Sequence, residues 1–145
     1  YGDHRDLHLS IRRQRQMCIR DSIITNPEVA KKLLHKDFTF SWMGIIEQGG
    51  KIWNRENLFD EYFKNIIPKI LPNGIILKTV DAISDNNGVA IIQEGDAEGK
   101  NGEYDNKYVW IFKMKDGLIY SLREYNSDIL VATQLYDYKL IPIDN

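Results

Sequence analysis

Hydrophobic and polar positions change their period near the middle of the chain. Before residue 68, apolar residues recur mainly at spacings of three and four, as on one face of a helix, apart from a short alternating strand at 38–42. From Ile75 onward, apolar and polar residues alternate, which indicates strands. Helices followed by a run of strands predict an α+β domain of two layers, in which helices pack on one apolar sheet face.

Two helices are predicted in the first half of the chain. Asn26 is a suitable N-cap ahead of Pro27, and Asn54 is a suitable N-cap for the second helix. Pro68, Pro72 and Asn73-Gly74 predict the end of that second helix. The apolar stripe of the second helix consists of Leu58, Phe59, Tyr62, Phe63, Ile66 and Ile67.

The second half predicts an antiparallel meander, because its strands are separated by short turn sequences at 85–88 and 115–117. Asn126, Ser127 and Asp128 all offer cap groups for a short C-terminal helix. The strands are predicted at 75–84, 88–97, 104–114 and 118–126.

The first 22 residues do not fit this pattern. Back-translated, residues 1–22 resemble the two ends of a short-read sequencing adapter without a mismatch. The basic run at 11–16, which resembles a nucleic-acid-binding patch, lies inside this stretch. We therefore expect residues 1–22 to be adapter-derived and residues 23–145 to form one domain.

Without that stretch the composition changes. The 19 basic and 21 acidic residues lose five and three members, which leaves 14 and 18 and a net charge of −4. No basic cluster remains, so we expect no nucleic-acid partner. Cys18 is removed and His35 is the only histidine left, so thiolate chemistry, a Cys/His zinc site and a Ser-His-Asp triad all lack parts. No apolar run approaches the roughly 20 residues that span a bilayer, and no signal peptide is evident, so a cytoplasmic protein is expected.

Alternation along the last strands predicts an aromatic cavity with a carboxylate inside it. A carboxylate buried among apolar groups has a raised pKa, which suits it to general acid or base catalysis. One face of the strand at 104–114 carries Tyr104, Asn106, Tyr108, Trp110 and Phe112, and the inner face of the next strand is expected to carry Leu118, Tyr120, Leu122 and Glu124.

Three segments near the end of the chain carry a family resemblance: Gly102-x-Tyr104-x-Asn106-x-Tyr108, then Lys115-Asp116-Gly117-Leu118-Ile119, then Arg123-Glu124-Tyr125. They resemble the nuclear transport factor 2-like (NTF2-like) superfamily, in its SnoaL-like and ketosteroid isomerase-like branch. The resemblance spans roughly residues 26–136. It implies a cone-shaped, curved antiparallel sheet packed against N-terminal helices, and no metal or cofactor. It also implies that the first helix of the family is missing here.

The resemblance further implies a homodimer formed through the outer sheet face, where Val109, Ile111 and Ile119 are expected. Glu124 stands where cyclases and epoxide hydrolases of the superfamily often carry an acid. The alternative is a carboxylate paired with Arg123 or a lysine at the rim of the sheet.

Glu94 and Asp96 are two residues apart on a neighbouring strand, and either could couple with Glu124 as a carboxylate pair. The alternative is a solvated hairpin end at 94–100. Glu94 stands where the epoxide hydrolases have an arginine, and this departure argues against their mechanism.

The remaining candidates are ligand contacts. Asn106, Tyr108 and Tyr120 could donate hydrogen bonds to a ligand carbonyl, or could satisfy polar groups in the core. Trp42 and Trp110 are expected to line the cavity, although packing alone would also explain Trp42. These residues predict binding of a small, largely apolar, cyclic molecule, with cofactor-free acid/base catalysis of the isomerase, cyclase or hydrolase type. The alternative is a non-catalytic binding or dimerisation module with a filled interior.

Overall fold

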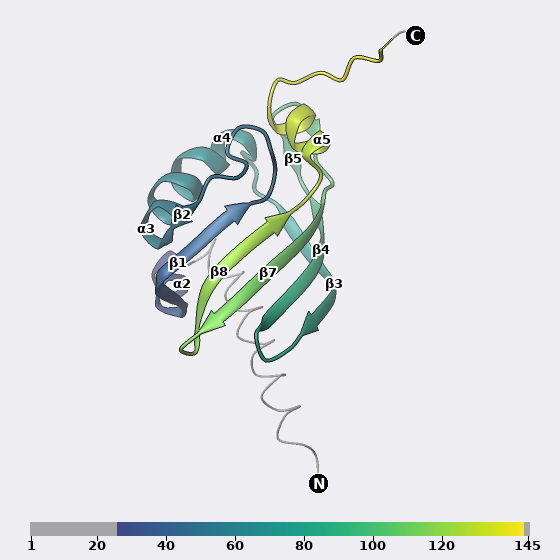
Figure 1. The fold of residues 1–145 in the computed structure, drawn as a ribbon. Helices are drawn as coiled ribbons and strands as arrows, with labels where there is room; N and C mark the ends of the chain where they lie inside the picture. The colour runs from purple at the N-terminus through teal and green to yellow at the C-terminus, as the bar shows by residue number, and fades with distance from the viewer. Residues whose placement is uncertain (1–25, 144–145) are drawn as a thin grey trace.

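The structure, a computed structural model, describes residues 26–143 and has an α+β architecture (Figure 1). The predicted adapter-derived stretch at 1–22 lies outside the described residues. The helices are α2 (Pro27–Leu33), α3 (Arg55–Asn57), the π-helix η1 (Leu58–Ile66), α4 (Ile67–Ile70), α5 (Asp128–Leu130) and the π-helix η2 (Val131–Leu135). The strands are β1 (Leu34–Trp42), β2 (Trp53–Asn54), β3 (Ile76–Ser84), β4 (Gly88–Asp96), β5 (Glu98–Gly99), β6 (Gly102–Glu103), β7 (Lys107–Lys115) and β8 (Leu118–Tyr125).

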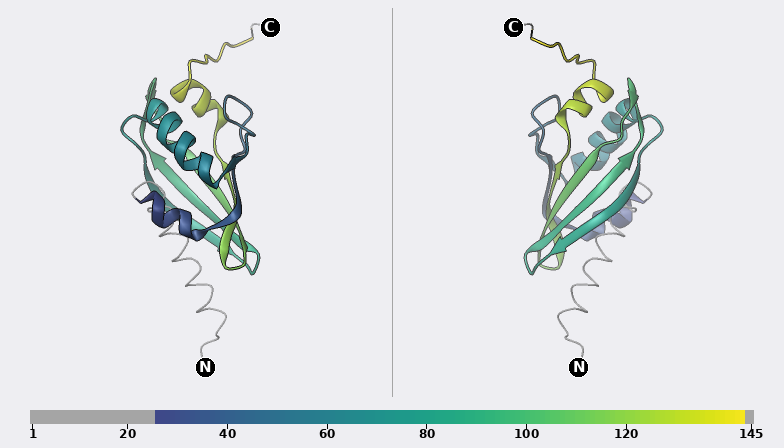
Figure 2. Two further views of the ribbon diagram at one scale, coloured as in Figure 1. Left: turned by 90° about the vertical axis from the view of Figure 1, so that its left-hand side faces the viewer. Right: turned by 90° about the vertical axis from the view of Figure 1, so that its right-hand side faces the viewer.

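Six strands form one sheet in the order β2-β1-β8-β7-β4-β3. Strands β3, β4, β7 and β8 pair antiparallel, which confirms the predicted meander. Strand β1 joins β8 in parallel, so the sheet is mixed, and β5 and β6 form a separate hairpin. The sheet is strongly curved, and helices α2 to α4 lie across its concave side (Figures 1 and 2).

The predicted helix caps are confirmed. The Asn26 side chain accepts a hydrogen bond from the backbone N–H of Val29, and Asn54 accepts one from that of Asn57 at 2.8 Å. The end predicted at Pro68 is wrong, because this proline occupies the first turn of α4 and needs no N–H partner there. The segment ends at Ile70, ahead of Pro72.

Two strand boundaries differ from the prediction. Strand β1 begins at Leu34, because parallel pairing with Ile119 of β8 extends it beyond the alternating segment. His35 therefore lies in the strand and is buried. Strand β7 begins at Lys107, because the chain before it turns back in the β5–β6 hairpin.

A register shift in the β7–β8 hairpin changes which side chains face inward. The turn at Asp116 and Gly117 has two positive φ angles, as a tight hairpin turn requires. Lys113 pairs with Ser121 but Met114 pairs with Ile119, so Tyr120 is an extra residue on β8. Ile119 therefore faces inward and is 1% exposed, whereas Tyr120 is 39% exposed. The predictions that Tyr120 faces the cavity and that Ile119 lies on the outer face are therefore wrong.

The core lies between the concave face of the sheet and helix η1. Leu58, Phe59 and Tyr62 are the buried face of η1, and each buried side chain of this size contributes roughly 1.5–3 kcal/mol. The Tyr62 ring contacts the rings of Phe40 and Trp53 at 5.3 and 5.1 Å between centroids. The first half of the sequence thus supplies one wall of the interior, and the meander supplies the other.

Candidate active site

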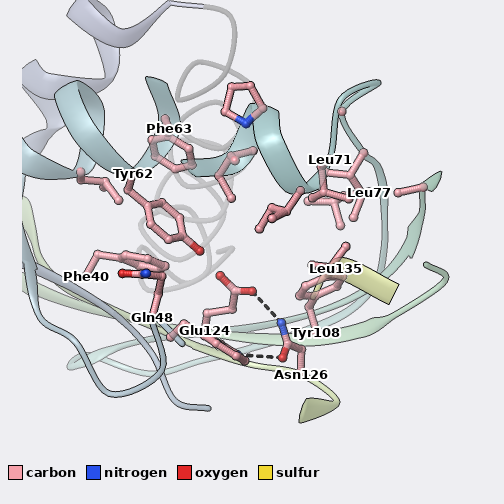
Figure 3. Close-up of a pocket in the computed structure, with 18 of the residues that line it drawn as sticks. Phe40, Gln48, Tyr62, Phe63, Leu71, Leu77, Tyr108, Glu124, Asn126 and Leu135 are labelled. Carbon is pink, nitrogen blue, oxygen red and sulfur yellow. Dashed lines mark hydrogen bonds between the residues drawn. The ribbon is translucent and has the colours of Figure 1, made fainter. Parts of the chain in front are cut away.

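A cavity of about 950 Å³ lies between the concave face of the sheet and the helices (Figure 3). Its volume is within the range of small-molecule sites, and aromatic and aliphatic side chains form most of its wall. The sheet contributes Phe40, Trp42, Ile91, Gln93, Tyr108, Trp110, Phe112, Leu122 and Glu124; the helices contribute Leu58, Phe59, Tyr62, Phe63, Ile67, Ile70, Val131 and Leu135. The interior is therefore not filled by core side chains.

Glu124 is the buried carboxylate of this cavity. It lies on the inner face of β8, between Trp42 of β1 and Trp110 of β7 in the sheet register, and its side chain is buried. Burial raises the pKa of Glu124 to about 8, because the apolar surroundings disfavour the charged form, while a hydrogen bond from Asn126 partly opposes the shift. The alternative pairing with Arg123 is excluded by the alternation of β8, which leaves Arg123 exposed on the other face.

The Glu124 carboxylate is held by a short chain of hydrogen bonds. The Asn126 Nδ2 donates to Glu124 Oε1 at 2.8 Å, and the indole Nε1 of Trp42 donates to Asn126 Oδ1 at 2.8 Å. Because the indole nitrogen can only donate, it fixes the amide with its NH₂ group toward the carboxylate. Trp42, predicted as a ligand contact, thus lines the cavity and also orients Asn126, which the sequence suggested only as a cap.

Tyr62 faces Glu124 from the opposite wall. Its hydroxyl points toward the carboxylate oxygen that Asn126 does not bind (Figure 3). The pKa of Tyr62 lies well above the usual value, first because the ring is buried and second because of the nearby Glu124. The sequence placed Tyr62 only in the apolar stripe of a helix, and no residue pattern marked its hydroxyl as part of a site.

Tyr104, Asn106 and Tyr108, which the sequence predicted on one face of a strand, form a second polar cluster. Tyr104 and Tyr108 line the cavity, and burial raises the pKa of Tyr104 to about 12 and that of Tyr108 further. Asn106 is buried but does not line the cavity. Its Nδ2 donates to the Tyr104 hydroxyl at 3.0 Å, and its Oδ1 accepts from the backbone N–H groups of Lys107 and Ser127. These bonds occupy both ends of the amide in place of the ligand contact expected from the sequence.

The two predicted partners of Glu124 lie elsewhere. Glu94 is exposed on the outer side of β4, with its Oε1 4.0 Å from the Lys107 Nζ. Asp96 is exposed at the rim of the cavity, at the end of β4. Neither carboxylate is among the causes of the raised pKa of Glu124, so the expected carboxylate coupling is not found. The strand alternation explains this, because Gln93 and Gly95 take the inward positions.

Gly95 has a specific packing role beside Tyr108. A Cβ atom at position 95 would lie 2.8 Å from Tyr108 Cε2 and 2.8 Å from Ile75 Cδ1, closer than side-chain atoms pack. The missing side chain therefore leaves room for the Tyr108 ring on the cavity wall, where it stacks on Trp110 at 5.7 Å between centroids. The sequence pattern indicated the aromatic face but not this requirement.

A metal site and a membrane-spanning helix are both absent from the described part of the chain. No group of three or more His, Cys, Asp or Glu side chains is placed to hold a metal ion within residues 26–143. Over the same residues, no helix is long and apolar enough to cross a membrane.

Comparisons with known proteins establish the fold. No protein-family model and no curated protein sequence matches the chain. An NTF2-like protein from Anabaena variabilis is 19% identical, with a TM-score of 0.67 over 88% of this chain and 95% of that one. A Bacillus subtilis protein named as a candidate isomerase is 14% identical, with a TM-score of 0.66 over 87% and 93% of the two chains. A phenazine biosynthesis-related protein from Pseudomonas aeruginosa is 14% identical, with a TM-score of 0.68 over 94% of each chain. The chain therefore has the NTF2-like cone fold expected from the resemblance.

Proposed function

We propose that this chain, a SnoaL-like variant of the NTF2-like fold, binds a small, largely apolar, ring-containing molecule and transfers a proton on it without a cofactor. The observation that carries the proposal is Glu124, a buried carboxyl group with a pKa of about 8 on the wall of an aromatic cavity of about 950 Å³. A purely structural module would have a filled interior at this position. Perturbed carboxyl groups in apolar pockets are typical of acid/base sites.

In this proposal Glu124 acts as the base and Tyr62 as a hydrogen-bond donor. The carboxylate removes a proton from the carbon next to a ligand carbonyl, and the electron pair of the broken C–H bond moves onto the carbonyl oxygen. The Tyr62 hydroxyl donates to that oxygen, since its raised pKa keeps it protonated over the whole working range. The protonated Glu124 then returns the proton to the same or a neighbouring carbon.

The pKa of Glu124 sets the pH dependence. At pH 7 roughly one tenth of the carboxyl groups are ionised, given a pKa of about 8. Activity as a base therefore rises through pH 8 and then levels off. A carboxylate with this pKa is also a stronger base than an exposed glutamate, because its charged form is poorly solvated.

The test uses 2-tetralone, an apolar two-ring ketone, and follows exchange of its α protons with D₂O by NMR between pH 6 and 9.5. We expect exchange above the buffer rate with a rise near pH 8, and a loss of about 10²-fold or more in Glu124→Gln. Glu94→Gln is the matched control, because it removes an exposed glutamate from β4 of the same sheet. Binding of 2-tetralone without Glu124-dependent exchange would replace the catalytic proposal with a non-catalytic binding module.

We also propose a homodimer through the outer face of the sheet. Ile76 and Ile83 on the edge strand β3 are 73% and 63% exposed, and Tyr125 on β8 is 38% exposed. Half-buried Val109 and Ile111 lie between them on β7. Light scattering should give twice the chain mass, and Ile111→Glu should shift it toward the monomer. A monomer at all concentrations contradicts this assembly.

A further inference from the structure

The wall of the cavity contains a second buried polar side chain, Gln93 on β4. It is 1% exposed, and its Nε2 donates to Thr79 Oγ1 at 2.9 Å. Its Oε1 is buried and has no hydrogen-bond partner. A buried acceptor left unpaired costs about 1–3 kcal/mol, and such groups are uncommon in folded proteins. A residue of the cavity wall therefore retains a buried acceptor that the protein's own groups do not satisfy.

The position of Gln93 relative to Glu124 follows from the sheet register. Gln93 is paired with Tyr108 of β7, and Glu124 is paired with Trp110 of the same strand. Strand β7 lies between β4 and β8, so the two side chains start two strands apart, on the order of 10 Å. The rings of Tyr108 and Trp110, stacked at an interplanar angle of 19°, occupy the wall between them. The cavity thus has two polar positions separated by aromatic surface.

We propose that Gln93 determines ligand specificity by accepting a hydrogen bond from a hydroxyl or N–H group at the far end of the ligand. The inference rests on the proposed function, in which the near end carries the carbonyl oxygen that meets Tyr62 and Glu124. The ligand class is therefore an elongated ring ketone with a hydrogen-bond donor at the end opposite the carbonyl. Such a donor provides the partner that Gln93 Oε1 lacks, while the Gln93–Thr79 bond is kept.

The experiment compares three ketones that differ only at the far end: 6-hydroxy-2-tetralone, 6-methoxy-2-tetralone and 2-tetralone. Dissociation constants are measured by calorimetry at pH 7, so the readout does not depend on turnover. We expect the hydroxy ketone to bind about tenfold more tightly than the methoxy ketone, because only the hydroxyl can donate. In Gln93→Met the two should bind within about twofold of each other, while 2-tetralone binds at least as well as before.

Gln134→Met is the matched control, because Gln134 is a half-buried glutamine on η2 that does not line the cavity, and it should keep the tenfold preference. If Gln93→Met does not fold, Gln93→Asn withdraws the acceptor by one methylene and should also lose the preference. Equal binding of the hydroxy and methoxy ketones by the unaltered chain, or a preference that survives in both Gln93 variants, overturns the role of Gln93. Glu124-dependent exchange of 2-tetralone would then still stand. Failure of all three ketones to bind overturns both proposals.

Discussion

Strands β8 and β4 run in the same direction and both carry acidic residues near their ends, yet these carboxylates differ in environment. Glu124 near the end of β8 is buried in the cavity wall with a pKa raised to about 8. Glu94 and Asp96 at the end of β4 are exposed. Because side chains alternate along a strand, one position decides whether an acid faces the cavity or the solvent. A position near the end of a strand beside the cavity is therefore not sufficient for a carboxylate to be buried in the cavity wall.

The two strand ends also differ in what surrounds the inward side chain. On β8, Asn126 donates to the carboxylate and Trp42 fixes the orientation of Asn126. On β4, the inward positions are Gln93, with a free oxygen, and Gly95, which accommodates the Tyr108 ring. The β8 end is thus built to hold a carboxyl group, and the β4 end contributes the neutral side chain of Gln93 to the wall of the same cavity.

The largest expected effect is on stability as a function of pH. The pKa of Glu124 is about 8 in the folded chain against a usual value of 4.5, so the folded state binds more protons between these values and loses stability as pH rises. Each pH unit in this interval costs about 1.4 kcal/mol, which is on the order of 5 kcal/mol in all. Glu124→Gln should therefore match the unaltered chain near pH 4.5 and exceed it increasingly up to pH 8.

Urea unfolding at pH 4.5, 6 and 8 measures this difference, with Glu94→Gln as the exposed counterpart. The Glu94 variant should stay within about 0.5 kcal/mol of the unaltered chain at each pH. If the free energy of unfolding of Glu124→Gln differs from that of the unaltered chain by the same amount at all three pH values, the carboxylates of the two strand ends do not differ as described.

The next largest effect is expected at Tyr62, which faces the β8 carboxylate and not the β4 end (Figure 3). Tyr62→Phe keeps the ring contacts with Phe40 and Trp53 but removes the hydroxyl donor. Exchange of 2-tetralone protons should slow by roughly 10- to 100-fold, with the pH midpoint still near 8. Phe63→Leu, on the same helix, tests whether a change in packing alone produces this loss. An unchanged rate in Tyr62→Phe would remove the hydroxyl from the mechanism.

A smaller effect is expected from the amide that holds Glu124. Asn126→Leu removes the hydrogen bond that lowers the pKa of Glu124, so this pKa should rise further above its usual value. The measurement is a carbon-13 NMR titration of the Glu124 carboxyl group. Trp42→Phe removes the indole donor that orients Asn126, so it should raise the pKa of Glu124 in the same direction but by less. A lower pKa in Asn126→Leu would contradict the role given to Asn126.

Much of the fold and one element of the site were predictable from local sequence patterns. The alternation along β7 correctly placed Tyr108, Trp110 and Phe112 on the cavity side, because a regular strand has a strict period of two. The burial of Glu124 followed from the same rule. Tyr120 was misplaced because a register shift after the hairpin turn is a tertiary feature that the alternation does not encode.

The rest of the site depends on contacts between segments far apart in the sequence. Tyr62 reaches Glu124 only because η1 crosses the concave face of the sheet, and Trp42 reaches Asn126 across the parallel β1–β8 pair (Figure 3). Gln93 is an ordinary strand residue until its register partner and its unpaired oxygen are known. Periodicity specifies a face, but not which side chains from different elements meet on it.

The smallest effect is expected at Asp96, the acid of the β4 end that comes closest to the cavity. It lines the rim but is exposed, so water screens its charge from the buried Glu124. Asp96→Asn should therefore leave the 2-tetralone exchange rate within about twofold and should not move the pH midpoint. A paired carboxylate would behave differently, because removing a nearby negative charge lowers the pKa of the remaining acid. If the pH midpoint of exchange in Asp96→Asn lies well below 8, Asp96 and Glu124 are a coupled pair, and the contrast between β4 and β8 is wrong.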